Sequence, residues 1–353
     1  MASPIKNNPF TADQHMQYFA EFCKGVEYGG GTTPHMLMTV EAASRHDSMT
    51  EQLWWAGCYA FVYNFATAEI LWVNHDPTTL DKYDRPDLED WITKHKPGIK
   101  MRKERKAVYS PKNLSICMVS YADYIQKLKS GEKEWFFHDD MPNRYQVAYD
   151  DICKSVKYMG RYIGIRWLEV IRRVFNIPHM EMPDLRSSGG DHPRKALALM
   201  YPEYESELMG GDDKATLAVV DDVAAYCLED LEKYGVYTDY YTIQSLLCEY
   251  KQSCLGKRQY PGKSIDTAMA YFTKVYDYWG EDEAEKSIIW DVRKSIFPKE
   301  FLGEVQGWNG VRNELGEVLV NHGYTWSDKI YDYVATAGDY QNPVYRGDKR
   351  TIL

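Results

Sequence analysis

The segment that most constrains the fold is an almost uninterrupted apolar run, TEQLWWAGCYAFVYNFATAEILW, at residues 50–72. Its apolar side chains cover nearly every face at helical spacing, and Thr50 followed by Glu51 suits a helix start. A helix that is apolar on all sides has to be covered by other elements. The sequence therefore predicts a central, buried helix over residues 50–72.

Three polar side chains interrupt this run, namely Asn64, Thr67 and Glu69. Burying a polar group is costly unless the group is hydrogen-bonded. Two interpretations stay open: these side chains bond to neighbouring backbone, or Asn64 and Glu69 line the floor of a substrate pocket. The window 53–73 carries these polar residues and has no basic flank, so we expect it to be buried in protein and not in a membrane.

The rest of the chain is also helical in pattern. Proline and glycine separate the apolar runs, and strand-like alternation is nowhere sustained. Amphipathic helices are predicted at 115–129, 144–158, 161–175, 214–234, 237–254, 264–279 and 310–321. We expect an all-α fold with one two-lobed helical domain over 1–337, an internal boundary near 209–213, and a C-terminal tail at 338–353.

Composition narrows the function classes. Seven scattered cysteines without a CxxC pair fit a reducing compartment, and the N-terminus lacks a signal-peptide layout, so a cytoplasmic location is expected. The net charge of −10 disfavours an extended polyanion-binding surface. Residues 94–112 nevertheless hold eight Lys/Arg against one acid, Glu104. This basic run is either a solvated face or a local footprint for phosphates. The 14% aromatic content likewise fits core packing or base stacking.

A second cation-rich segment lies between two helical runs at residues 251–266. Its Gly262-Lys263-Ser264 ending lacks the upstream glycine of a P-loop, which excludes a Walker-type nucleotide site. Glycines and cations in such a loop suit a phosphate or pyrophosphate, with Arg258 as a forked donor. An equally open interpretation is a polar interhelical loop, with Asp266 in the first turn of the following helix.

Two further segments carry candidate anion contacts. Gly160 stands at a sharp entry to an amphipathic helix, followed by Arg161, and Asp184 comes 24 residues after the glycine. Glycine lets a backbone approach a DNA phosphate, although an ordinary helix start has the same pattern. Near Asp191, Arg194 and Lys195 fall in a first helical turn, where the helix dipole disfavours cations. Either a bound anion or an ordinary surface explains them.

These segments together carry a family resemblance. The Gly160-Arg161 helix start followed by Asp184 is similar to the helix-hairpin-helix DNA glycosylases, with Tyr158 where the first glycine of the hairpin is expected. The chain resembles more closely a phage family, the alpha-glutamyl/putrescinyl thymine pyrophosphorylases or amino acid:DNA transferases. Four stretches carry that resemblance: LWWAGCYAFVYNFATAEILW, the Gly160-Arg161 segment, HPRKALALMYPE and LLCEYKQSCLGKRQYPGKSID. It implies a DNA-glycosylase-like helical fold with a degenerate helix-hairpin-helix.

The resemblance also implies an activity. An amine, from an amino acid or putrescine, replaces pyrophosphate on the 5-methylene of pyrophosphorylated 5-hydroxymethyluracil in DNA, within an infected bacterial cell. The partners would be DNA carrying a modified pyrimidine and a small amine, with no membrane. No cofactor is required, although Mg²⁺ is compatible with pyrophosphate. The alternatives are a non-catalytic nucleic-acid-binding helical protein, or a glycosylase-like or base-kinase accessory enzyme of the same pathway.

Roles follow from the resemblance for residues of four kinds. The carboxylates would act as the catalytic base, the cations would hold pyrophosphate, the apolar helix and loop would form the pocket, and the hairpin would hold the DNA backbone. The residues for the catalytic base are Asp184 and Asp266, and those for pyrophosphate are Arg194, Lys195, Lys257 and Arg258. The pocket residues are Asn64, Glu69, Lys251 and Tyr260, and the residues at the DNA backbone are Gly160 and Arg161.

Overall fold

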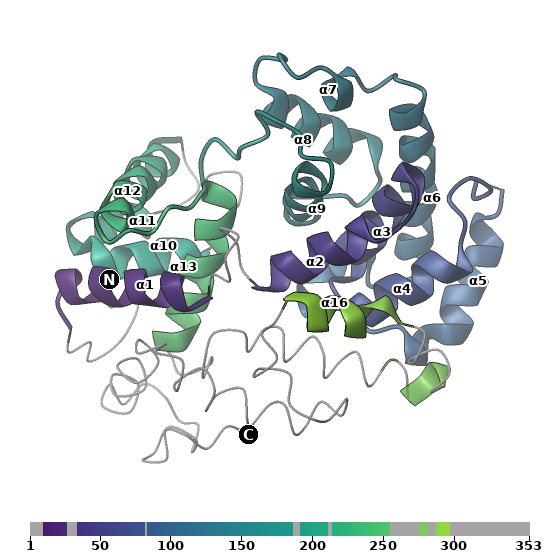
Figure 1. Cartoon of the computed structure of the whole chain (residues 1–353), viewed down its shortest axis with the longest axis horizontal. Helices are drawn as coiled ribbons and strands as arrows, with labels where there is room; N and C mark the ends of the chain where they lie inside the picture. Colours follow the sequence, from purple (N-terminus) through teal and green to yellow (C-terminus); the bar gives the residue numbers. More distant parts are fainter. Residues whose placement is uncertain are drawn as a thin grey trace. The chain divides into compact units, whose positions relative to one another are not determined.

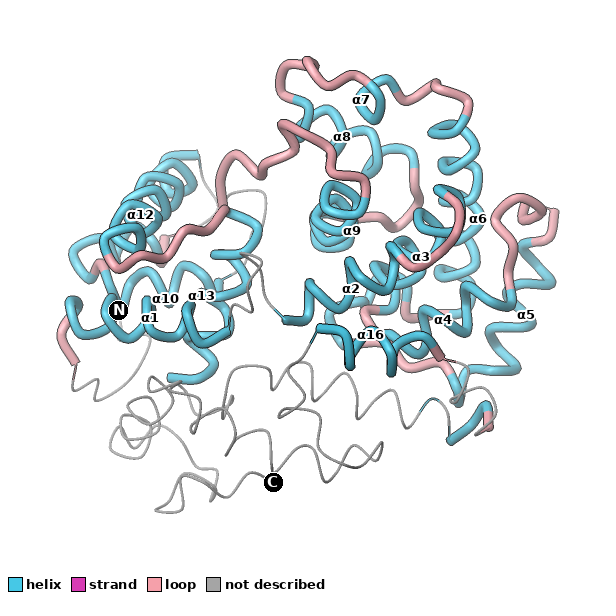
Figure 2. The backbone as a smooth tube through the Cα atoms, in the orientation of Figure 1, coloured by secondary structure: helices cyan, strands magenta, loops and turns pink. Residues whose placement is uncertain are grey.

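The computed structural model describes residues 10–26, 34–81, 83–185, 191–210, 214–254, 275, 277–280 and 287–296. Every regular element within these residues is a helix, which confirms the all-α prediction (Figure 1, Figure 2). The elements are α1 Ala12–Val26, α2 Pro34–Ser44, α3 Met49–Val62, α4 Phe65–Asn74, α5 Arg85–His95, η1 Lys96–Gly98, η2 Lys103–Val108, α6 Pro111–Lys129, α7 Glu134–Phe137, α8 Arg144–Ser155, α9 Arg161–Val174, α10 Asp191–Met200, η3 Pro202–Tyr204, α11 Glu205–Leu208, α12 Lys214–Lys233, α13 Tyr240–Cys254 and α16 Ile288–Ile296. None of the helices in these ranges combines the length and apolarity of a membrane span.

Five of the predicted amphipathic helices appear as α6, α8, α9, α12 and α13. Helix α6 starts earlier than expected, at Pro111, because Ser110 is its N-cap and accepts a hydrogen bond from the Asn113 N–H at 3.1 Å. The predicted helix at 310–321, most of the one at 264–279, and the tail at 338–353 lie outside the described residues.

The described residues divide into two compact units. Unit 1 takes them from Met1–His35 and Met182–Asp266, and unit 2 takes them from Met36–Glu181 and Thr267–Ile296. The glycine-rich break near 209–213 lies within unit 1, between α11 and α12.

Unit 2 is built around α3, which packs against α4, α6 and α9. All residues of α3 from Leu53 to Val62 are buried, as the apolar run predicts. The helix begins earlier than the Thr50–Glu51 start suggested by the sequence. Ser48 is the N-cap: its hydroxyl accepts from the Glu51 N–H at 3.2 Å, and the Glu51 carboxylate accepts from the Ser48 N–H at 3.1 Å. This reciprocal pair is a capping box, which satisfies two donors at the helix end.

The single helix predicted over 50–72 is wrong, because the chain forms two helices with a break at Tyr63 and Asn64. Tyr63 ends α3 in the left-handed region at φ 53°, and its N–H donates to the Tyr59 carbonyl at 2.6 Å. Asn64 then caps α4, since its side-chain oxygen accepts from the Thr67 N–H at 2.9 Å. Asparagine competes with helical backbone hydrogen bonds in this way, and it tolerates helix starts better than helix interiors.

Unit 1 packs α1, α10, α12 and α13 against one another. Helices α1 and α13 meet at a buried polar pair, where the His15 Nδ1 lies 2.8 Å from the Tyr250 hydroxyl. Burial lowers the pKa of His15 to about 4, so the ring is neutral at physiological pH. A neutral ring offers one donor and one acceptor, which suits this contact between two helices.

Candidate functional site

Helices α8 and α9 pack together and are joined by the short connection at residues 156–160 (Figure 1, Figure 2). Within it, the Met159 N–H donates to the Val156 carbonyl at 3.2 Å, and the Gly160 N–H donates to the Tyr158 carbonyl at 2.8 Å. Tyr158 has φ 61°, in the left-handed region that glycine adopts without strain. The position at which a hairpin glycine is expected thus has a glycine-like backbone, although it carries a tyrosine.

Gly160 is the N-cap of α9, and the structure gives it no internal reason to be glycine. Its φ of −73° and ψ of 173° are open to any residue. A Cβ added at this position meets no atom within 4 Å. Neither backbone conformation nor packing within the described residues therefore requires a glycine here.

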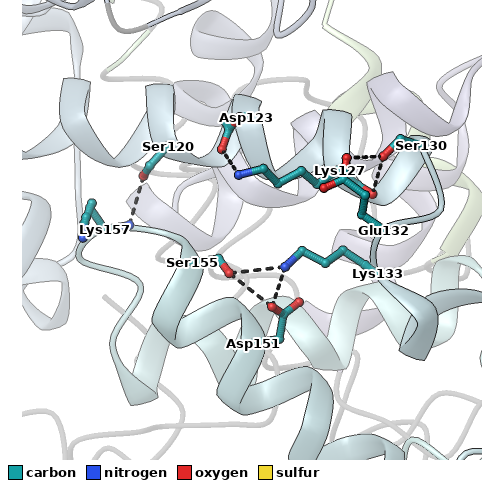
Figure 3. A network of polar contacts seen from close by, with 9 residues as sticks. All are labelled: Ser120, Asp123, Lys127, Ser130, Glu132, Lys133, Asp151, Ser155 and Lys157. Atoms are coloured by element: carbon teal, nitrogen blue, oxygen red, sulfur yellow. Dashed lines mark hydrogen bonds and ion pairs between the residues drawn. The ribbon is translucent and has the colours of Figure 1, made fainter.

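We call residues 156–160 together with the first turn of α9 the α8–α9 hairpin, and its surface carries exposed aromatic and basic side chains. Tyr158 is 40% exposed and Tyr162 is 43% exposed, while Lys157 and Arg161 are also exposed. No acid occurs in the sequence from Lys157 to Leu168. The backbone N–H of Lys157 donates to the Ser120 hydroxyl of α6 at 3.0 Å, which fixes the connection to unit 2 (Figure 3). The start of α9, with the positive end of its dipole, is thus flanked by two exposed cations.

A cation cluster in unit 1 joins two of the predicted site segments. Helices α10 and α13 pack together, and the Lys251 Nζ lies 3.1 Å from the His192 Nδ1 across 59 residues of sequence. Lys251 and Arg194 are both buried, Lys195 is half-buried, and His192 is exposed. An ammonium only donates, so the His192 Nδ1 accepts and the ring carries its proton on Nε2. We call the three cations Arg194, Lys195 and Lys251, together with His192, the α10–α13 cation cluster; Arg194 and Lys195 belong to it as neighbours of His192 on α10, and the contact that joins the two helices is that of Lys251 with His192. The sequence patterns did not select His192.

Asp184 lies in unit 1 near the opposite end of α13. Burial first, and then the carboxylates of Asp221 and Asp184, raise the pKa of Tyr240, the first residue of that helix. At about 1.5 Å per residue, Tyr240 and Lys251 are separated by roughly 16 Å along the axis. A substrate held by Lys251 would have to extend along α13 to meet Asp184.

The remaining predicted residues of this region, Asp266, Lys257, Arg258 and Tyr260, lie outside the described residues. In the described ranges, no three His, Cys, Asp or Glu side chains converge as a set of metal ligands.

Asn64 and Glu69, the predicted pocket residues of unit 2, both make structural contacts. The cap formed by Asn64 confirms that this side chain bonds to neighbouring backbone. Glu69 is buried and accepts a hydrogen bond from the Ser287 hydroxyl, just before α16. The Thr67 hydroxyl accepts from the Lys100 N–H at 3.0 Å. Asn64, Thr67 and Glu69 therefore each have a partner, whereas the buried Nε1 atoms of Trp54 and Trp55 have none among the described residues. A role of Asn64 and Glu69 in substrate binding stays a prediction.

Part of the basic run at 94–112 turns inward, which neither sequence interpretation anticipated. The Arg105 Nε donates to the Ala60 carbonyl at 2.8 Å, and the Arg102 N–H donates to the Val62 carbonyl at 3.2 Å. Both guanidinium groups lie over the Tyr63 ring, at 4.6 and 4.9 Å from its centre. These two residues cap the C-terminus of α3, where carbonyl groups and the helix dipole favour cations.

A polar network between α6, α7 and α8 is a second feature that local patterns do not reveal. Asp151 accepts from the Lys133 Nζ at 2.6 Å, the Tyr124 hydroxyl at 2.7 Å, the Trp135 Nε1 at 3.0 Å and the Ser155 hydroxyl at 3.1 Å (Figure 3 shows the Lys133 and Ser155 contacts). Burial opposes ionisation of Asp151, but these hydrogen bonds outweigh it and lower its pKa. Lys133 also lies 3.5 Å from the Ser155 hydroxyl and forms its ion pair with Asp151 at 2.6 Å. The network ties α6, α7 and α8 together.

No family model, no curated protein and no solved structure matches the chain. The case for a function therefore rests on the residues of the hairpin and of the α10–α13 cation cluster.

Proposed function

We propose that this protein modifies DNA: it binds DNA through the α8–α9 hairpin and transfers an amine to pyrophosphorylated 5-hydroxymethyluracil, releasing pyrophosphate. The observation that carries the proposal is Gly160, a glycine that its own fold does not need. A glycine lets another backbone approach closely, and a phosphate group of DNA is the partner that a helix N-terminus favours. Any side chain at this position would hold the phosphate away.

The side chains around Gly160 support the same partner. Arg161 and Lys157 are exposed cations that add charge-dependent affinity for phosphates. Exposed tyrosines at 158 and 162 offer flat apolar surface beside them. A duplex target base has to leave its stack before chemistry, and aromatic side chains stabilise unstacked bases.

The α10–α13 cation cluster suits the leaving group. In the reaction, the bond between the 5-methylene carbon and the pyrophosphate oxygen breaks, and the electron pair leaves with pyrophosphate. Arg194, Lys195 and Lys251 would stabilise that developing negative charge. The attacking nitrogen forms the new carbon–nitrogen bond only after its ammonium has lost a proton. A carboxylate, Asp184 or Asp266, would accept that proton. Asp184 would do so only for a substrate that extends along α13, because Tyr240 beside it is roughly 16 Å from Lys251.

The proposal is tested with purified protein, DNA containing pyrophosphorylated 5-hydroxymethyluracil, and a panel of amino acids and putrescine. We expect pyrophosphate release with at least one amine, and a nucleoside whose mass equals that of 5-hydroxymethyldeoxyuridine plus the amine minus one water. Lys251→Met should lower turnover by about a hundredfold, the usual effect of removing one charge-stabilising donor. Lys233→Met, at a 72% exposed lysine of the same unit, should leave turnover unchanged. Absence of pyrophosphate release with every amine would contradict the proposal.

A non-catalytic DNA-binding protein is the second candidate, and one observation favours it. Asn64 and Glu69, expected in a pocket, are engaged by the Thr67 N–H and the Ser287 hydroxyl. Under this alternative, wild type and Lys251→Met would bind DNA equally and neither would release pyrophosphate. The same pair of proteins therefore separates the two candidates.

A further inference from the structure

Four aromatic rings gather in unit 2 at the C-terminal end of α5. We call Trp91, His95, Tyr278 and Trp279 the aromatic platform. Trp279 stacks on His95 at 4.8 Å between ring centres and on Trp91 at 5.7 Å, and Tyr278 meets Trp279 edge-on at 5.3 Å. Residues 277–279 form the short helical turn beside the end of α5 in Figure 1.

The rings of the platform are held in fixed positions by Gly98. The Trp279 Nε1 donates to the Gly98 carbonyl at 3.1 Å. A Cβ at Gly98 would lie 2.2 Å from Tyr278 Cδ1 and 2.6 Å from the Trp279 Nε1, so only glycine allows this approach. The Tyr278 hydroxyl also lies 3.3 Å from the His95 Nδ1. These contacts fix the stack before any ligand binds, which reduces the entropy lost on binding.

The platform remains accessible to solvent. Tyr278 is 42% exposed, and Trp91, His95 and Trp279 are half-buried. Partial burial and the neighbouring Lys94 lower the pKa of His95, so its ring is neutral at physiological pH. The platform therefore presents uncharged aromatic rings at the protein surface, with Tyr278 the most exposed of the four. Single exposed aromatic residues are common on protein surfaces, whereas a fixed stack of four is not.

Cations flank these rings. Lys94 and Lys96 are exposed on either side of His95, Lys100 is half-buried, and no acid occurs in the sequence from Trp91 to Lys103. Acids also lie close in sequence to the rings: Asp90 and Asp277 are exposed, and Glu281, Asp282, Glu283 and Glu285 follow Trp279 in a stretch outside the described residues. Unlike Arg102 and Arg105, which cap α3, Lys94 and Lys96 are exposed and form no ion pair with the described residues.

We propose that the aromatic platform is a binding site for single-stranded DNA, with bases stacked on the rings and phosphates beside Lys94, Lys96 and Lys100. Bases of a duplex already stack on one another and offer only their edges, whereas an unpaired strand offers faces. A rigid aromatic stack combined with flanking lysines is the combination that recognises such a strand without reading its sequence. This site is separate from the hairpin, and it does not depend on the transfer chemistry.

The test measures binding of a fluorescent twenty-residue oligothymidylate by anisotropy at several salt concentrations. Tyr278→Ala should lower the affinity at least about fivefold, because base stacking on one ring contributes roughly 1 kcal/mol or more. Tyr278→Phe keeps the ring and should bind as wild type. Lys96→Gln should reduce the slope of log affinity against log salt by about 0.7, the value for one phosphate contact on a single strand.

Matched controls lie away from the platform. Tyr237→Ala changes a 72% exposed tyrosine of unit 1, and Lys129→Gln changes an exposed lysine of α6; both should bind as wild type. Failure of the wild-type protein to bind the oligonucleotide would overturn the proposal. Equal affinity of Tyr278→Ala and Tyr237→Ala would overturn it too. A Gly160→Ala protein that loses duplex binding but still binds oligothymidylate would support the proposal that the platform and the hairpin are separate sites.

Discussion

Gly160 and Gly164 lie one turn apart at the start of α9, and they differ in what surrounds them. A Cβ at Gly164 would lie 2.9 Å from the Cys153 Sγ of α8, whereas a Cβ at Gly160 meets nothing within 4 Å. Gly164 is therefore a packing residue that lets two helices approach. Gly160 has no such neighbour and no backbone conformation that demands glycine. The comparison separates a glycine that the packing of the fold explains from one that the described residues do not explain.

Gly57 in α3 is a closely packed glycine like Gly164, and its substitution is expected to have the largest effect on stability. A Cβ at Gly57 would lie 2.0 Å from Cε1 of Tyr121. That ring cannot move freely, because its hydroxyl donates to the Leu53 carbonyl at 2.5 Å and accepts from the Trp167 Nε1 at 2.7 Å. Gly57→Ala should lower the free energy of unfolding by about 3 kcal/mol in urea titrations. A change within about 0.5 kcal/mol, as at surface positions, would show that the packed region is not tight.

Tyr121→Phe tests the same region through hydrogen bonds instead of volume. The substitution leaves the Trp167 N–H and the Leu53 carbonyl without their partner in a buried place. We expect a loss of about 2 kcal/mol in the free energy of unfolding, the usual cost of an unsatisfied buried group. Tyr83→Phe is the control, since Tyr83 is 76% exposed, and its stability should match that of wild type. Equal stability of the two variants would contradict the packing described for Tyr121.

Gly164→Ala should have a smaller effect, because two contributions oppose each other. Alanine favours the helix by roughly 0.5–1 kcal/mol, but its Cβ lies too close to the Cys153 Sγ. We expect a net loss of about 1 kcal/mol in the free energy of unfolding. Adding Cys153→Ala removes the sulfur, so the double variant should lose less than the sum of the two single changes. Strict additivity would mean that Gly164 is not limited by Cys153.

Local sequence patterns predicted most of unit 2's fold but not the break in its central run. The run at 50–72 reads as one helix because its apolar residues continue across Tyr63 and Asn64. The signal for the break was present, since Asn64 is a favoured N-cap and Thr67 stands where a capped N–H is expected. The prediction followed the apolar pattern, which favours one continuous helix, whereas the capping preference of Asn64 favours the break that the structure has. The start of α9 after Gly160, by contrast, was predicted correctly.

The candidate sites were predictable only where the signal is local. Lys251 and Arg194 were selected from separate segments, but His192 was not, because its contact with Lys251 depends on the packing of α10 on α13. The aromatic platform is missed for the same reason, since Trp91 and Trp279 are far apart in sequence and meet only in the folded unit. Tertiary contacts of this kind leave no mark on composition or periodicity.

The most direct test of the hairpin's role is Gly160→Ala, measured for both thermal stability and affinity for a twenty-base-pair duplex. Alanine fits φ −73° and ψ 173° without a clash, so we expect stability to be unchanged or raised by about 0.4–1 kcal/mol. We expect the duplex affinity to fall at least about tenfold, because the Cβ keeps a phosphate from the backbone. Wild-type affinity in a fully stable Gly160→Ala protein would contradict the assignment of this hairpin to DNA.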